Sequence, residues 1–339
     1  MAAVKGQKIT AIDYNNLATD INKVFSDEYR NSAPPTSNQA MLNQEFGWGN
    51  TAVSDVDVGT KITAAVVNSL VDRVNLSAEH VGSEYELDRV IRGQKITHSI
   101  WNDIETVIMD VTPNKNTAAI GQTTISELGS IARSAPFSNN LNFVSTLTFA
   151  NYDQARYYFN SGSSFKLYLV KLAGDSVDAG WASAYERMGT VNIGLTNTLS
   201  TTANVISENK GFEDLTSESS LLLTSIQGGE GYGYGGYGYG GGYGYGGGNG
   251  YGYGYGYGYG YGTGGSKTIK VYGKTEPAQG TSYQTGPVNL IITVSLNSLA
   301  AQATSGTHTL YIQSNKATTK TSGNITFSIS NPQFGGVVS

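Results

Sequence analysis

Apolar residues at a helical spacing recur three times in the first third of the chain. Each run follows the lead-in Gly-x-Lys-Ile-Thr, which ends at Thr10, Thr63 and Thr97. In each run an apolar residue followed by asparagine comes first, and further apolar residues follow at the offsets that keep them on one helical face. The sequence therefore predicts three helical repeat units with one buried face each. Their predicted core residues are Tyr14, Leu17, Ile21, Val67, Leu70, Val74, Trp101, Ile104 and Ile108.

Start signals for these helices are also present. The threonine that ends each lead-in is a predicted N-cap, and Asp13 stands at the capping-box position of the first unit. The units begin 53 and then 34 residues apart, which is too irregular for a uniform solenoid. Residues 1–115 therefore form either a compact helical domain or a string of small modules. Core packing is the expected role of the apolar positions, and the alternative is that one unit docks onto a larger assembly.

Beyond Pro113 the pattern changes to a period of two, with Ser, Thr, Asn and Gly between short runs. This alternation predicts short strands, whose spacing favours an antiparallel β-sandwich-like domain. The fold class is therefore α+β, with residues 116–227 and 266–339 supplying the β-rich part. The predicted strands are 143–149, 165–171, 191–193, 268–272, 289–296, 307–313 and 324–330, the predicted short helices are 152–159 and 181–188, and 219–226 fits either type.

Residues 228–265 form a tract of glycine and tyrosine that interrupts the β-rich part. An extended Tyr-Gly alternation places tyrosines on one face and bare backbone on the other, which suits contact with sugar rings or with the same stripe of another subunit. Ordering such a tract costs about 1–2 kcal/mol of backbone entropy per residue, so we favour subunit packing ahead of host contact. A flexible linker is the alternative. The predicted contact residues are Tyr232, Tyr234, Tyr237, Tyr239, Tyr243, Tyr245, Tyr251, Tyr253, Tyr255, Tyr257, Tyr259 and Tyr261.

Several stretches of the chain resemble parts of one protein family. The most specific is Asn151–Gly162, which contains Asp-x-Ala-Arg-Tyr-Tyr-Phe-Asn-Ser-Gly and lies between the predicted strand 143–149 and Gly189–Gly194. This stretch resembles virion structural proteins of tailed bacteriophages. The Lys-Ile-Thr units are similar to N-terminal modules of such proteins, especially from marine and cyanobacterial phages. The closing strands, 289–330, are similar to the end of the same domain. The resemblance implies a structural part of the particle without catalytic residues, and it gives no role to the Gly/Tyr tract.

Composition and charge exclude several classes of function. The chain has 339 residues with 14% charged, a net charge of −5 and no cysteine. The absence of a basic cluster argues against a nucleic-acid partner, and the absence of cysteine removes thiolate metal sites. No signal peptide or membrane-spanning segment is predicted, so we expect assembly in the host cytoplasm. We predict no catalytic, cofactor or metal site, because Asp55-x-Asp57-x-Gly59 lacks the glutamate of a calcium loop and the histidines follow no metal-binding spacing.

Three hypotheses follow. The first is a structural protein of a tailed phage virion, a tail fibre or tail-associated appendage, which forms a small homo-oligomer, commonly a trimer. Its expected partners are other virion proteins and a host surface glycan. The alternative is a subunit of an extracellular filament or adhesin that the Tyr/Gly stripes hold together. The third is an enzyme that degrades surface polymer, but no carboxylate pair stands out in the sequence.

Overall fold

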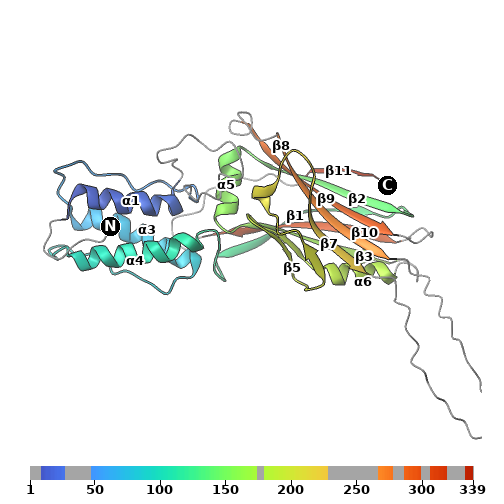
Figure 1. The fold of residues 1–339 in the computed structure, drawn as a ribbon, viewed down its shortest axis with the longest axis horizontal. Coiled ribbons are helices and arrows are strands. Elements are labelled where there is room, and N and C mark those ends of the chain that lie inside the picture. Colours follow the sequence, from blue (N-terminus) through green and yellow to red (C-terminus); the bar gives the residue numbers. More distant parts are fainter. Residues whose placement is uncertain are drawn as a thin grey trace, which may run out of the picture.

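The computed structural model describes residues 9–26, 47–173, 179–227, 266–277, 286–298, 306–318 and 333–338. They form a mixed α+β structure with a helical bundle at one end and two packed antiparallel sheets at the other (Figure 1). The helices are α1 (Ala11–Phe25), α3 (Ala64–Val81), α4 (His98–Asn114), α5 (Tyr152–Asn160) and α6 (Ala179–Met188), with a 3-10 turn, η2, at Phe212–Asp214. The strands are β1 (Thr123–Arg133), β2 (Asn140–Phe149), β3 (Ser164–Leu172), β4 (Val191–Ile193), β5 (Thr198–Ser200), β6 (Val205–Ser207), β7 (Ser220–Gln227), β8 (Lys267–Glu276), β9 (Val288–Ser298), β10 (Thr307–Ala317) and β11 (Gln333–Val338).

Helices α1, α3 and α4 begin directly after the three threonines of the lead-ins. The Thr10 and Thr63 hydroxyls accept hydrogen bonds from the third residue of their helices, and Thr10 and Asp13 complete the capping box. The prediction is wrong in one detail, because Thr97 makes no side-chain capping hydrogen bond. Helix α4 also continues through Pro113, where the sequence pattern changes.

The three helices pack against one another as a parallel bundle. In their first turns, the rings of Tyr14 and Trp101 lie 6.3 Å apart, and the Tyr14 hydroxyl bonds the Ser69 hydroxyl. At their last turns, the Lys115 ammonium donates to the carbonyl of Lys23 at the end of α1. Of the two arrangements that the sequence left open, the structure therefore has the compact one. The nine residues expected in the helical core are all buried, with at most 5% of their surface exposed.

The β-rich part has a five-stranded sheet in the order β1-β10-β3-β4-β5 and a six-stranded sheet in the order β11-β2-β9-β8-β7-β6. The connections from β1 to β2 and from β9 to β10 each cross from one sheet to the other. Strands far apart in the sequence therefore pair, β1 with β10 and β2 with β9. The inner faces follow the expected alternation, and β2 buries every second residue. Segment 219–226 is a strand, and the predicted strand 324–330 lies outside the described residues.

The two ends of the sandwich have different neighbours. The end that faces the helical bundle holds Phe149 of β2, Ser164 of β3 and Glu276 of β8, and helix α5 lies there between bundle and sheets (Figure 1). The opposite end holds Gln227 of β7 and Lys267 of β8, which pair with each other across the two strands. Because β8 is ten residues long, these ends are separated by about 30 Å.

Candidate functional site

Side chains of helix α1 clamp an extended segment that runs back along the bundle. The amide nitrogen of Asn15 donates to the carbonyl of Val56 at 3.0 Å, and its amide oxygen accepts from the Val56 N–H at 2.8 Å. Three residues earlier in the strap, Val53 makes the same two bonds with Asn22, both at 2.9 Å. We call an asparagine with this paired contact a clamp, and we call the extended segment that it holds a strap.

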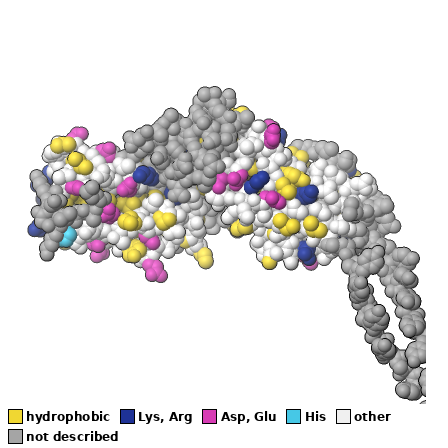
Figure 2. All heavy atoms as spheres, viewed as in Figure 1, with side chains coloured by type: hydrophobic (Ala, Val, Ile, Leu, Met, Phe, Trp, Pro, Cys, Tyr) yellow, Lys and Arg dark blue, Asp and Glu magenta, His cyan; other side chains and the backbone are white. Residues whose placement is uncertain are grey.

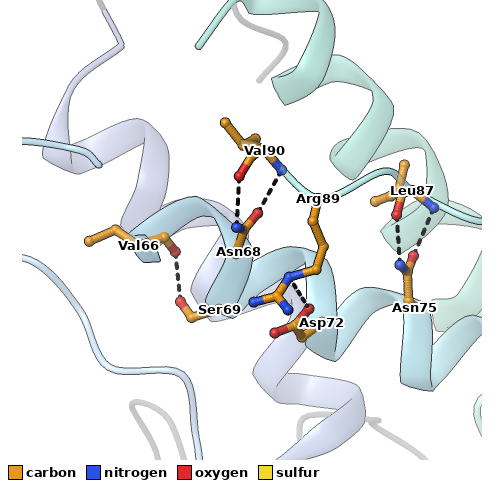
Figure 3. Close-up of polar contacts among 8 residues, drawn as sticks. All are labelled: Val66, Asn68, Ser69, Asp72, Asn75, Leu87, Arg89 and Val90. Atoms are coloured by element: carbon orange, nitrogen blue, oxygen red, sulfur yellow. Dashed lines mark hydrogen bonds and ion pairs between the residues drawn. The ribbon is translucent and has the colours of Figure 1, made fainter. Parts of the chain in front are cut away.

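Helix α3 repeats the arrangement with the strap that leads into α4 (Figure 3). Asn68 pairs with the N–H and carbonyl of Val90 at 2.8 and 2.9 Å, and Asn75 pairs with those of Leu87 at 2.9 and 2.8 Å. Between the clamps, Arg89 of the strap contacts Asp72 of the helix at 3.3 Å. The two asparagines are seven residues apart, as in α1, and their strap partners are three residues apart in both cases.

A clamp provides hydrogen-bond partners for the backbone of a strap that packs on a helix. The backbone groups of a helix interior are already paired, so a strap that packs on a helix finds no ladder to join. The asparagine amide offers one donor face and one acceptor, and can therefore stand in for the peptide unit of a neighbouring strand. Each strap thus buries an aliphatic side chain, such as Val53 or Val90, without leaving its peptide groups unpaired.

Helix α4 has only the first of the two asparagine positions that form clamps on α1 and α3. Asn102 stands at the same offset from its N-cap as Asn15 and Asn68, but its amide oxygen is buried and has no hydrogen-bond partner among the described residues. Seven residues on, where α1 and α3 have a second asparagine, α4 has Met109, which is 70% exposed. After Asn114 the chain turns away into the β-rich part, so no strap from the described residues crosses this face of α4.

A buried polar network joins the bundle to the sandwich. The indole N–H of Trp48 donates to the carbonyls of Lys115 and Asn160, at 3.0 and 3.1 Å. The His80 ring lies 4.3 Å from the Trp48 ring, and its Nε2 bonds the Ser161 carbonyl at 2.9 Å. These contacts connect α3, α4 and the 47–50 segment to the end of α5, so they fix the bundle on the sheets.

The pKa values at this junction follow from its burial. Desolvation lowers the pKa of His80 to about 4, so its ring is neutral and donates from Nε2 to the Ser161 carbonyl. Desolvation, with the nearby charges of Arg156 and Lys23, lowers the pKa of Lys115 to about 7. Both pKa shifts therefore reflect the burial of these two side chains in the interface between bundle and sandwich.

The stretch 151–162, which contains helix α5, forms the sandwich side of this junction. Arg156 is fully buried, with its guanidinium 4.5 Å from the Tyr157 ring centre and 3.5 Å from the Asp153 carboxylate. Gly162 has a φ of +78°, and a β-carbon there would come within 2.5 Å of the Ala118 nitrogen. The requirement for these residue types is therefore structural, and the motif holds the two halves of the molecule together.

The twelve tyrosines predicted as a contact surface lie outside the described residues. The structure describes where the tract is attached, because β7 ends and β8 begins on either side of it and the two strands pair up to Gln227 and Lys267. Lys267 at the start of β8 is buried under α6, and its ammonium lies 5.9 Å from the Trp181 ring centre. The tract is therefore anchored at the sandwich end that points away from the helices.

The described residues contain no group of His, Asp and Glu side chains arranged to hold a metal ion, and no helix among them has the length and apolar character needed to cross a membrane. Asp55 and Asp57, weighed above as a calcium loop, are exposed on the first strap. On the face drawn in Figure 2, charged side chains of both signs are scattered singly over the described part of the chain. No family model, curated protein or solved structure matches the chain.

Sequence reasoning noticed the first asparagine of each helix but not its role, and it missed Asn22 and Asn75. The sequence did contain a signal for the clamps. Val53 and Val56 stand ten and seven positions before Thr63, and Leu87 and Val90 stand ten and seven positions before Thr97. Only the structure shows that this spacing matches a pair of asparagines seven residues apart on the preceding helix.

Proposed function

We propose that the protein is a structural component of a tailed phage virion, a tail fibre or tail-associated appendage. In this proposal the three Lys-Ile-Thr units are repeat modules that attach the protein, and the Gly/Tyr tract is an insertion that contacts neighbouring subunits or a host surface glycan. The observation that carries the proposal is the separation of the two parts. The bundle and the anchoring strands of the tract lie at opposite ends of one continuous structure.

Three further features support this assignment. Residues 151–162 resemble virion proteins, and they build the junction that fixes one end of the molecule relative to the other. Double-sheet folds whose chain crosses between sheets are common in viral capsid and lectin domains, although this is an analogy at the level of fold. Charged side chains of both signs spread over the face drawn in Figure 2 suit a structural role.

Immunogold electron microscopy of the native source tests the proposal with two antibodies, one against residues 228–265 and one against residues 50–62. We expect both to label tails or appendages of particles, with the tract antibody farther from the particle. If the tract antibody labels only particles that have been disrupted, and not intact ones, the tyrosines lie between subunits. Label along fibres without any particle would overturn the proposal in favour of an extracellular filament.

A further inference from the structure

The ring of His80 lies where the helical bundle meets the sandwich, and none of its surface is exposed. It stands in the last turn of α3, 4.3 Å from the Trp48 ring, and its Nε2 bonds the Ser161 carbonyl just after α5. The other ring nitrogen, Nδ1, is also buried and has no hydrogen-bond partner among the described residues. These surroundings therefore fit a neutral ring, which donates from Nε2 and carries no proton on Nδ1.

A proton on this ring would make Nδ1 a donor without an acceptor and would bury a charge. The junction already buries two cations, Arg156 and Lys115, and the charge of Arg156 opposes the charging of Lys115. Two carboxylates lie close by. Asp153 is 3.5 Å from Arg156, and Glu79, which is half-buried on α3, favours the charged form of His80. A protonated His80 would therefore be a third buried cation in the same interface.

We propose that His80 makes this junction an acid-sensitive latch. When the ring takes up a proton, the contact of His80 with Trp48 and Ser161 opens, and the bundle separates from the sandwich while both stay folded. Each part has internal contacts that do not pass through the junction, namely the asparagine clamps of the bundle and the strand pairs of the sandwich. The only ligand is a proton, so the inference does not rest on the virion assignment.

The direction of the effect follows from the His80 pKa in the two forms. Burial lowers this pKa to about 4 in the closed junction, and a solvated ring returns to 6.5. The closed form is therefore fully favoured above pH 6.5. As the pH falls from 6.5 to 4, the open form takes up the proton first, and the opening equilibrium rises by up to about 300-fold. The pKa of Lys115 is about 7 because of burial and the charges of Arg156 and Lys23, so below about pH 6 this group is charged in both forms and adds no further change.

Fluorine NMR of the full chain labelled with 5-fluorotryptophan separates the latch from general unfolding, because the three tryptophans report on different places. Trp48 lies at the junction, Trp101 packs on Tyr14 in the bundle, and Trp181 lies on α6 against the sheets. Replacing each tryptophan with phenylalanine assigns the three signals. Between pH 6.5 and pH 4 we expect the Trp48 signal to change while the other two keep their native positions.

Two variants connect this change to the proton on His80. His80→Gln keeps an amide that can donate to the Ser161 carbonyl but does not titrate, so it should keep the native signals and abolish the acid change of Trp48. Glu79→Gln removes the carboxylate that favours the proton and should move the change of Trp48 to lower pH without abolishing it. A histidine with a merely structural role would not show this shift of the midpoint.

Separation of the two parts is measured as the distance between two spin labels. Because the chain has no cysteine, Met109→Cys on α4 and Ile206→Cys on β6 place one label on each part at exposed positions. We expect a single narrow distance distribution at pH 7.5 and a longer, broader one at pH 4, whereas with His80→Gln it stays narrow. The proposal is overturned if all three tryptophan signals change together, if the Trp48 change persists in His80→Gln, or if the label distance is the same at both pH values.

Discussion

Replacing Asn22 with alanine removes the two hydrogen bonds between its side-chain amide and the backbone of Val53 in the first strap. Asn22 is 1% exposed and Val53 is 5% exposed, so water cannot easily take over either lost bond. Two hydrogen bonds contribute about 1 kcal/mol each, and a buried donor or acceptor that loses a hydrogen-bond partner costs about 1–3 kcal/mol. The better helix propensity of alanine returns about 0.5 kcal/mol. We therefore expect Asn22→Ala to lower the free energy of unfolding by about 3 kcal/mol.

Asn102→Ala is the informative comparison. This side chain stands at the helical position of Asn15, the first clamp of α1, but its amide oxygen has no hydrogen-bond partner among the described residues. Its removal therefore breaks no clamp, and the free energy of unfolding should change by less than about 0.5 kcal/mol. Asn16→Ala, at an exposed position of α1, controls for the loss of an amide as such.

The assay is urea denaturation followed by circular dichroism, with tryptophan fluorescence as a second probe of the same transition. Coincident transitions would justify a two-state treatment, and an unchanged dependence on urea would show that the unfolded state is not altered. The reasoning would be refuted if Asn22→Ala and Asn102→Ala cost the same. That result would mean that the clamps contribute no more than an unpaired amide does.

Three other perturbations test the caps and the junction. Gly162→Ala should cost about 3 kcal/mol or more, because it adds a backbone clash to the strain of a positive φ, whereas Gly121→Ala, with a φ of +86° and open space, should cost only about 1 kcal/mol, both measured by thermal melting. Thr10→Ala should cost about 1 kcal/mol by the same assay while Thr97→Ala costs almost nothing, and equal losses would refute the assignment of the capping box. The His80 pKa is about 4 in the folded state and 6.5 in the unfolded state, so the unfolded state takes up the proton first as pH falls. Between pH 7.5 and pH 5 this group should therefore remove about 2 kcal/mol of stability from the wild type relative to His80→Gln, measured by denaturation at each pH, and parallel pH profiles would contradict that burial.

The helices and most of the sandwich could be predicted from the sequence because each rests on a local pattern. The helix caps, the 3.6-residue period of α1 and the alternation along β2 can each be recognised in a stretch of about a dozen residues. Strand β1 gave no such signal, since it lies at a sheet edge and most of its residues are exposed or half-buried. Strands β5 and β6 have three residues each and are too short to show a period.

The candidate sites were less predictable, because they depend on pairs of segments. A clamp needs an asparagine on one helix and an aliphatic residue on a strap 12 to 41 residues later, and neither is distinctive alone. The junction likewise joins Trp48 to Asn160, which are 112 residues apart. No local sequence pattern indicates that the Asp-x-Ala-Arg-Tyr stretch contacts the helical bundle. None indicates that the Gly/Tyr tract is attached at the end of the sandwich away from that bundle.

Mass spectrometry of tailed particles, purified on a density gradient from the native source, tests the central proposal most directly. We expect the chain to sediment with the particles in a constant ratio to their major structural protein, and to remain with them after a high-salt wash. Its recovery only in particle-free fractions, as fibres or as free protein, would contradict a structural role in a phage virion.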